Sequence, residues 1–300
     1  MNDTASTSPP PQKPSFGGRW TYAILIVAVL FVSMPFLFWN ATWFGRPLTD
    51  DQIAKAFQDR KHAREIQHAL TQIEQRMERN DPTVRHWYPQ LVTFADDPLT
   101  EIRVTDAWVM GQDTTAPDFH EALSKMLTDP DPMVARNAAL SLVRFGDPSG
   151  HSVIVSMLAP YAVPAQATGT LRRRLKPGET VNPGTMIGHI DSNGESREAR
   201  IKVPGTIINW TVADKTEVTE GQPIMLVAPS QEMVWEALRA LYLIGQPEDV
   251  PVIAPYVRAA DAMPPQIQQQ AKLTMQQIES RQVAPASLPA SDDRQKKPSP

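Results

Sequence analysis

The hydrophobic positions in the first half of the chain recur with the spacing of amphipathic helices. On one predicted helix, apolar side chains return every three or four positions and so share one face: Ile66, Leu70, Ile73 and Met77. Comparable patterns continue to residue 160, and another series runs from 230 to 282. The spacing therefore predicts helices over 49–160 and 230–282, separated by a segment of different character.

A helical module recurs within the first of these stretches. One copy runs from Asp97-Pro98 to Gly111 and the next from Asp131-Pro132 to Gly146, with Arg103 and Arg136 33 residues apart. Asp-Pro favours a helix start, because the carboxylate caps free backbone amides and proline fits the first turn. The trailing glycines predict left-handed helix ends.

This module resembles the HEAT repeat. Residues 131–148 match the short bacterial form well, with Asp-Pro, Val-Ala-Arg, Ala-Ala and Gly-Asp-Pro in order, 97–111 match it partly and 81–95 loosely. The resemblance implies a solenoid of stacked helix pairs, whose broad surfaces bind proteins and supply no catalytic geometry.

The segment between the helical stretches contains one small β unit written twice. Val181 and Val218 are 37 residues apart, as are two further matched pairs, Gly184 with Gly221 and Ile187 with Ile224. Such coincident spacings indicate internal duplication. Short strands are expected at Leu171–Leu175, Met186–Ile190, Arg200–Val203, Thr206–Val212 and Ile224–Val227. We interpret 161–229 as an insertion between the two helices of one repeat.

The duplicated valine and glycine pattern, with Pro204-Gly205-Thr206 opening the second half, resembles the biotinyl/lipoyl domain. Carrier members of that family hold biotin or lipoate on a hairpin lysine, but the matching stretch here, 191–198, has none. Lys202 is expected in the following strand and Lys215 in a later turn. The unit is therefore more similar to the unmodified barrel-sandwich hybrid of periplasmic adaptor proteins, without their coiled coil, and no cofactor is expected.

The N-terminal region predicts a membrane anchor. Residues 21–39 carry no charge, and nineteen helical residues span close to 30 Å. We expect a transmembrane helix at 20–44 in preference to a cleaved signal peptide, and disordered tails at 1–19 and 283–300. We also expect a short cytoplasmic tail, with the bulk of the chain extracytoplasmic, in the periplasm. The predicted fold class is thus mainly α: one transmembrane helix, a HEAT-like α-solenoid, and an inserted small all-β barrel-sandwich domain.

The composition of the chain excludes several kinds of functional site. The 300-residue chain has a net charge of −4, which indicates no nucleic-acid surface, and no cysteine, which excludes disulfides and thiol catalysis. Its six histidines lack the close pairing of metal sites. HEAT-repeat hydroxylases use several His-Glu pairs, whereas this chain has one, His120-Glu121. We predict no catalytic, cofactor-binding or metal-ligating residues.

Two groups of side chains suggest binding instead. Arg172, Arg173 and Arg174 are candidates for binding an anion, although alternation along a strand would point them to opposite faces. Three tryptophans could either anchor a partner or pack in the core: Trp87, Trp108 and Trp235.

The sequence therefore favours a non-enzymatic scaffold or accessory subunit. It would bind partner proteins, as part of a membrane complex, through the helical repeats and the β unit, with no small-molecule substrate evident. The alternatives are an adaptor component of a transport complex, suggested by the β unit, and a modified carrier or enzyme.

Overall fold

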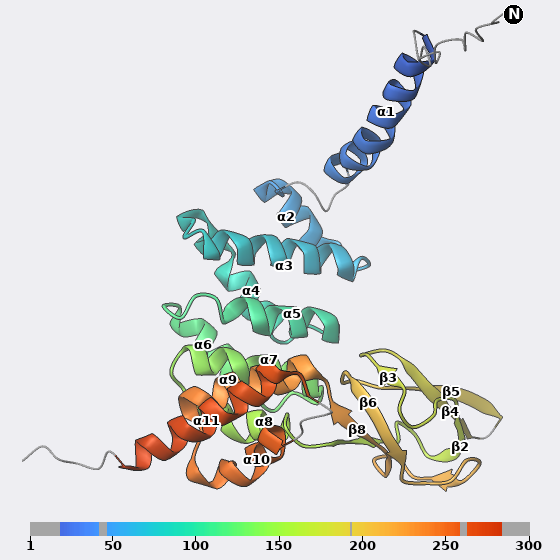
Figure 1. The fold of residues 1–300 in the computed structure, drawn as a ribbon, viewed down its shortest axis with the longest axis vertical. Helices are drawn as coiled ribbons and strands as arrows, with labels where there is room; N and C mark the ends of the chain where they lie inside the picture. Colours follow the sequence, from blue (N-terminus) through green and yellow to red (C-terminus); the bar gives the residue numbers. More distant parts are fainter. Residues whose placement is uncertain (1–18, 42–46, 193, 259–262, 284–300) are drawn as a thin grey trace, which may run out of the picture. The chain divides into compact units, whose positions relative to one another are not determined.

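The computed structural model describes residues 19–41, 47–192, 194–258 and 263–283. The chain forms two compact units, 1–55 and 56–300. The first contains helix α1 (Arg19–Ala41), and helix α2 (Asp50–Gln58) crosses the boundary (Figure 1). Apart from Arg19 and Val283, the tails predicted at 1–19 and 283–300 lie outside the described residues.

The prediction of a transmembrane helix at 20–44 is wrong. Among the described residues, no helix combines the length and the apolar character needed to cross a bilayer. The interpretation as a single-pass membrane protein with its bulk in the periplasm is corrected accordingly, as is attachment to a membrane through this helix.

The helices of 56–300 form two layers. Those of the first layer pack each on the next: α3 (Ala63–Glu78), α5 (Thr100–Met110), α7 (Pro132–Arg144), α9 (Gln231–Ile244) and α11 (Pro265–Val283). Short helices between them form the second layer: η2 (Pro82–Trp87), α4 (Tyr88–Phe94), α6 (Pro117–Met126), η3 (Pro148–Gly150), α8 (His151–Ser156), η4 (Pro247–Asp249) and α10 (Val250–Arg258).

Local chemistry explains where several of these helices begin. At Asp81, Asp131 and Asp147 the carboxylate caps the following helix by accepting the backbone N–H two residues on, at 2.9, 3.0 and 2.8 Å in turn. The Asp97 carboxylate accepts the Leu99 N–H at 2.9 Å. The predicted cap is therefore confirmed at Asp131, whereas α5 begins at Thr100 with Leu99, not Asp97, as its N-cap.

The two predicted glycine ends differ. Gly146 has the expected positive φ of 77°, but Gly111 does not. Gly111 serves close packing, because a Cβ there would lie 2.3 Å from Oγ of Ser141 on α7. That hydroxyl donates to the Ala107 carbonyl on α5 at 2.8 Å.

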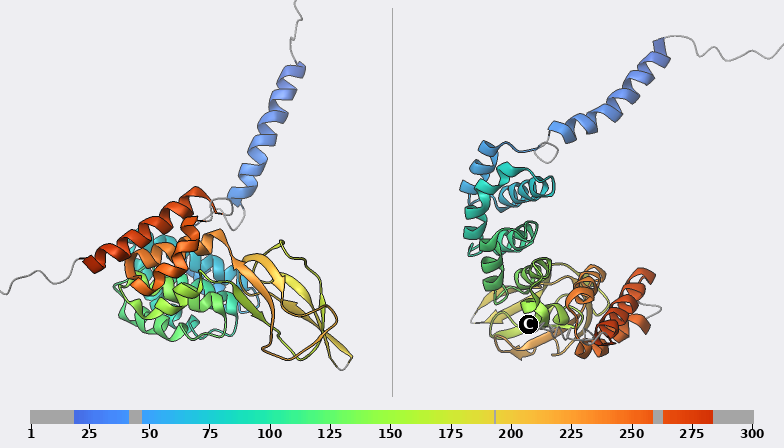
Figure 2. Two further views of the ribbon diagram at one scale, coloured as in Figure 1. Left: turned by 60° about the horizontal axis from the view of Figure 1, so that its bottom comes forward. Right: turned by 90° about the vertical axis from the view of Figure 1, so that its left-hand side faces the viewer.

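Eight strands between α8 and α9 gather in one β unit (Figure 2). They form two four-stranded sheets, in the orders β1-β8-β6-β3 and β5-β4-β2-β7, with antiparallel pairing throughout. The strands are β1 (Tyr161–Pro164), β2 (Gly169–Arg173), β3 (Thr180–Val181), β4 (Met186–Ser192), β5 (Glu195–Arg200), β6 (Gly205–Trp210), β7 (Glu217–Val218) and β8 (Pro223–Pro229).

One strand is misplaced by the sequence prediction. The strand expected at 200–203 lies at 195–200, where β5 forms a sheet edge. Of its six residues only Ala199 is buried, so β5 lacks the hydrophobic alternation on which the prediction depended.

The two copies of the β unit share backbone geometry. The Gly184 N–H donates to the Ile201 carbonyl and the Gly221 N–H to the Ala165 carbonyl, both at 2.8 Å. Both glycines have positive φ, 86° and 82°. The matched spacing in the sequence thus corresponds to matched turns.

The helical layers continue across the β unit. The Tyr256 hydroxyl donates to the Leu158 carbonyl at 2.6 Å, and His151 Nε2 lies 2.7 Å from an Asp249 oxygen. Each pair is 98 residues apart in sequence. Helices α7 and α8 therefore share one hydrophobic core with α9, α10 and α11.

Candidate functional site

A groove runs over the first helical layer and is lined by side chains of α5, α7, α9 and α11. Its volume is about 630 Å³. The lining residues on α7 and α9 repeat at helical intervals, Leu140 with Val143 and Arg144, and Glu236 with Ala240 and Leu243. Such spacing places them on one stripe of each helix, so the groove follows from how neighbouring first-layer helices present these stripes.

Exposed apolar side chains concentrate in this groove. In the described part of 56–300, four large hydrophobic residues are strongly exposed. Three of them line the groove, Tyr242 at 38 %, Leu243 at 61 % and Leu273 at 43 %, while the fourth, Ile208 at 43 %, lies on β6. A contiguous exposed apolar patch marks an interaction surface more often than scattered exposed residues do.

Charged residues border the apolar patch. Arg144, at the end of α7, places its guanidinium carbon 6.0 Å from the centre of the Trp108 ring. The Trp108 indole N–H donates to Glu74 at 2.6 Å, which fixes the ring. Across the groove, Arg239 and Glu236 lie 3.6 Å apart on α9. Arg144 and Trp108 therefore lie together on one side of the groove, and Arg239 and Glu236 on the other.

The three tryptophans singled out in the sequence have different roles. Trp87 packs edge-on against Phe57, with ring centres 5.4 Å apart, and its indole nitrogen is buried without a hydrogen-bond partner. Trp235 packs against the helical core. Trp108 lines the groove. Core packing therefore accounts for two of the three, and one contributes to a surface.

The exposed groove residues were missed by sequence reasoning. The available signal was the run Leu241-Tyr242-Leu243-Ile244 at the end of α9. The side chains of four consecutive helical residues point in directions that cover most of the helix circumference. A helix packed on one side therefore cannot bury all four.

The arginine run does not form one anion site. Arg172 pairs with Asp191 at 2.5 Å, whereas the Arg173 guanidinium carbon lies 5.3 Å from the Trp210 ring centre. Arg174 follows the end of β2 and is exposed. Alternation along the strand separates these side chains, as the sequence suggested.

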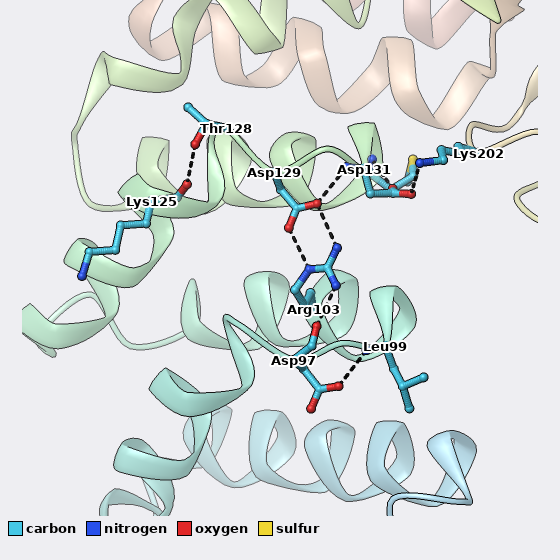
Figure 3. A network of polar contacts seen from close by, with 9 residues as sticks. Asp97, Leu99, Arg103, Lys125, Thr128, Asp129, Asp131 and Lys202 are labelled. Atoms are coloured by element: carbon cyan, nitrogen blue, oxygen red, sulfur yellow. Dashed lines mark hydrogen bonds and ion pairs between the residues drawn. The ribbon is translucent and has the colours of Figure 1, made fainter. Parts of the chain in front are cut away.

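The lysines near the β hairpin make structural contacts. Lys202 lies 3.6 Å from Asp131 and so links the β unit to the start of α7 (Figure 3). Lys215 occupies a turn with φ of 60°. Neither lysine lies in the β4–β5 hairpin itself.

Three histidines, His62, His120 and His151, each pair with an aspartate. His120 Nε2 lies 2.7 Å from an Asp147 oxygen, matching the pair that His151 makes with Asp249. Within the described ranges, no three or more His, Cys, Asp or Glu side chains gather as metal ligands would.

One ionisable group is strongly perturbed but lies away from the groove. Asp106 on α5 is fully buried, and burial raises its pKa well above the ordinary value of an aspartate. Neither carboxyl oxygen has a hydrogen-bond partner. Because no solvent reaches Asp106, it contributes nothing to the groove surface.

Comparison with known proteins adds little to this geometry. The chain matches no family model and no curated protein. A solved structure of a single-chain, multi-domain long-chain acyl-CoA carboxylase shares 14 % identity over 42 % of this chain, with a TM-score of 0.23. This chain covers 14 % of the length of that enzyme. A likeness at this TM-score carries no argument about fold or function.

Proposed function

We propose that this protein is a non-enzymatic scaffold or accessory subunit that binds a partner protein through the groove on α5, α7, α9 and α11. Its helical layers would be a HEAT-like solenoid, and its β unit an unmodified relative of the biotinyl/lipoyl domain that serves as a second, passive surface. The sequence motifs described above support both resemblances.

The observation that carries this proposal is the concentration of exposed apolar side chains in one place. Three of the four strongly exposed large hydrophobic residues in the described part of 56–300 line the groove. An apolar side chain is less stable in water than when buried, by about 25 cal/mol for each Å² of apolar surface. A partner that covers Leu243 and Leu273 would recover this free energy.

Site-specific photocrosslinking tests the proposal. A benzophenone amino acid at Leu243 of the full-length chain, in the cells that produce it, should yield a discrete adduct with another protein. Leu273→Asp should abolish the adduct, because a carboxylate would then face the apolar contact.

Position 208 supplies the control. Ile208 is as exposed as Leu273, at 43 %, but lies on β6. The same photoreactive group at Ile208 should not give this adduct. Equal cross-linking from both positions, or none from Leu243 in a folded protein, would contradict a partner-binding groove.

A further inference from the structure

The groove carries positive charge that its own residues do not neutralise. It is lined by two arginines, Arg144 and Arg239, and one carboxylate, Glu236. That carboxylate lies 3.6 Å from Arg239, on the same helix. Throughout the part of the chain that the structure describes, no carboxylate lies within 4.0 Å of the Arg144 guanidinium. Arg144 is therefore an exposed groove cation that is free to pair with a carboxylate of a partner.

Arg144 contacts the Trp108 ring, and no described residue accepts a hydrogen bond from its guanidinium. The guanidinium lies near the Trp108 face, an arrangement that orients it through its positive charge. The Glu74 carboxylate accepts the Trp108 indole N–H and so is already engaged on the ring edge. A guanidinium in this position can still offer two parallel N–H groups to an incoming carboxylate.

The apolar part of the groove has the spacing that a helix recognises. Apolar pairs three residues apart border it, formed by Leu140 with Val143 on α7 and by Ala240 with Leu243 on α9. Leu273 on α11 contributes from the third helix. Ridges of such spacing accept the matching ridges of another helix, whose anchors recur at i, i+3, i+4 and i+7.

We propose that the groove receives an amphipathic helix of a partner protein, with an aliphatic face against Leu243 and Leu273 and a flanking carboxylate paired to Arg144. This proposal rests on the partner-binding function of the groove. It adds the chemical class of the partner: an acidic, helical segment rather than a basic or an extended one.

A displayed peptide library tests this chemistry directly. Random 16-residue peptides on phage are selected against the full-length chain, and peptides that also bind the Leu273→Asp variant are discarded. Peptides that remain should carry apolar residues at helical spacing and an excess of Asp and Glu beside them.

Charge reversal at the rim gives the decisive comparison. Against Arg144→Glu, the selected acidic peptides should bind about fivefold more weakly, since an exposed charge pair contributes up to about 1 kcal/mol. A repeated selection against Arg144→Glu should enrich lysine and arginine instead. Ile208→Asp, which adds one negative charge outside the groove at a position as exposed as Leu273, should leave binding of the acidic peptides unchanged.

The two proposals fail in different ways. Selected peptides that depend on Leu273 but show no acidic excess, or no helical spacing, would overturn the acidic helix while leaving the partner-binding groove intact. No peptide dependent on Leu273, together with no adduct from Leu243, would overturn both. Equal binding of acidic peptides to the parent chain and to Arg144→Glu would also refute the charge pairing.

Discussion

Arg103 on α5 binds both carboxylate oxygens of Asp129, the residue two positions before Asp131 (Figure 3). The two N–O distances are 2.7 and 3.0 Å, and the side chains are 12 % and 9 % exposed. The same guanidinium donates to the Asp97 carbonyl at 2.7 Å. Arg103 thus joins the loop before α5 to the loop before α7.

Removing this arginine should destabilise the protein strongly. Arg103→Met leaves the Asp129 carboxylate nearly buried with its charge unpaired, and we expect a loss of about 3 kcal/mol in free energy of unfolding. Urea denaturation followed by tryptophan fluorescence measures it. The double variant Arg103→Met with Asp129→Asn should lose less than the sum of the single changes, because no unpaired charge remains.

An exposed ion pair supplies the control for that experiment. Lys125 and Glu121 lie 2.8 Å apart on α6, each 72 % exposed. Lys125→Met should leave the unfolding midpoint unchanged, since solvent screens such pairs. A shift as large as that of Arg103→Met would show that charge count, rather than burial, decides stability here.

Because Asp106 is buried, we expect it to make the free energy of unfolding depend on pH. Burial raises its pKa in the folded state, so the folded protein binds more protons than the unfolded chain above the unfolded pKa of about 3.9. The free energy of unfolding should therefore fall as pH rises from that value through the folded pKa. Asp106→Asn removes this term, and its stability advantage over the parent chain should grow with pH across the same window.

The pKa of Asp81 is shifted in the opposite direction, so Asp81 serves as the comparison. The hydroxyl and backbone amide of Thr83 lower the pKa of Asp81 in the folded state. The stability it contributes is present above the unfolded pKa and is lost as pH falls through the folded pKa. If Asp106→Asn and Asp81→Asn show the same pH trend, the burial argument for Asp106 is wrong.

Equivalent turns in the two halves of the β unit differ in one residue. Gly178 and Lys215 are 37 residues apart and have φ of 90° and 60°. Each donates its N–H to a core strand at 2.8 Å, to the carbonyls of Ile207 and Leu171 respectively. A left-handed conformation strains lysine but not glycine.

We therefore expect Lys215→Gly to stabilise the protein by about 0.5–1 kcal/mol, allowing for the greater freedom of glycine when unfolded. Gly178→Lys should destabilise it by a similar amount. Thermal unfolding followed by circular dichroism compares both variants with the parent chain. A loss of stability in Lys215→Gly would mean that its side chain, rather than its backbone, matters at this turn.

The helical layers should fold without the β unit. The helical and β cores share no buried residue, and Met133 is the partly buried side chain that contacts both. Replacing 161–229 with a short Gly-Ser linker should retain cooperative unfolding and the helical circular dichroism signal. Loss of both would contradict an insertion between helices that already belong together.

The β unit covers one group whose exposure would change in that deletion. Arg136 is 5 % exposed, donates to the Met233 sulfur at 2.9 Å, and lies 5.6 Å from the Tyr161 ring centre. Burial lowers its pKa. Adding Arg136→Met to the deletion separates the effect of uncovering this residue from the effect of losing the β unit.

Much of the secondary structure follows from local chemistry and was predictable. Asp131 caps its helix whatever packs around it, and the turns at Gly184 and Gly221 need positive φ in both copies. Polar β5 was misplaced because an edge strand does not have to alternate. The apolar run at 21–39 predicted a membrane span that the described helices do not provide.

The sequence by itself determined several helix starts and the duplicated turns, because these depend on residues close together along the chain. It did not predict strands β1, β3 and β7. Only the tertiary structure decided which apolar residues remain in water. Leu243 and Leu273 line one groove because α9 and α11 pack side by side, beyond the β unit, next to α7. Exposure depends on what covers a side chain, and here the covering helices come from segments far apart in the sequence.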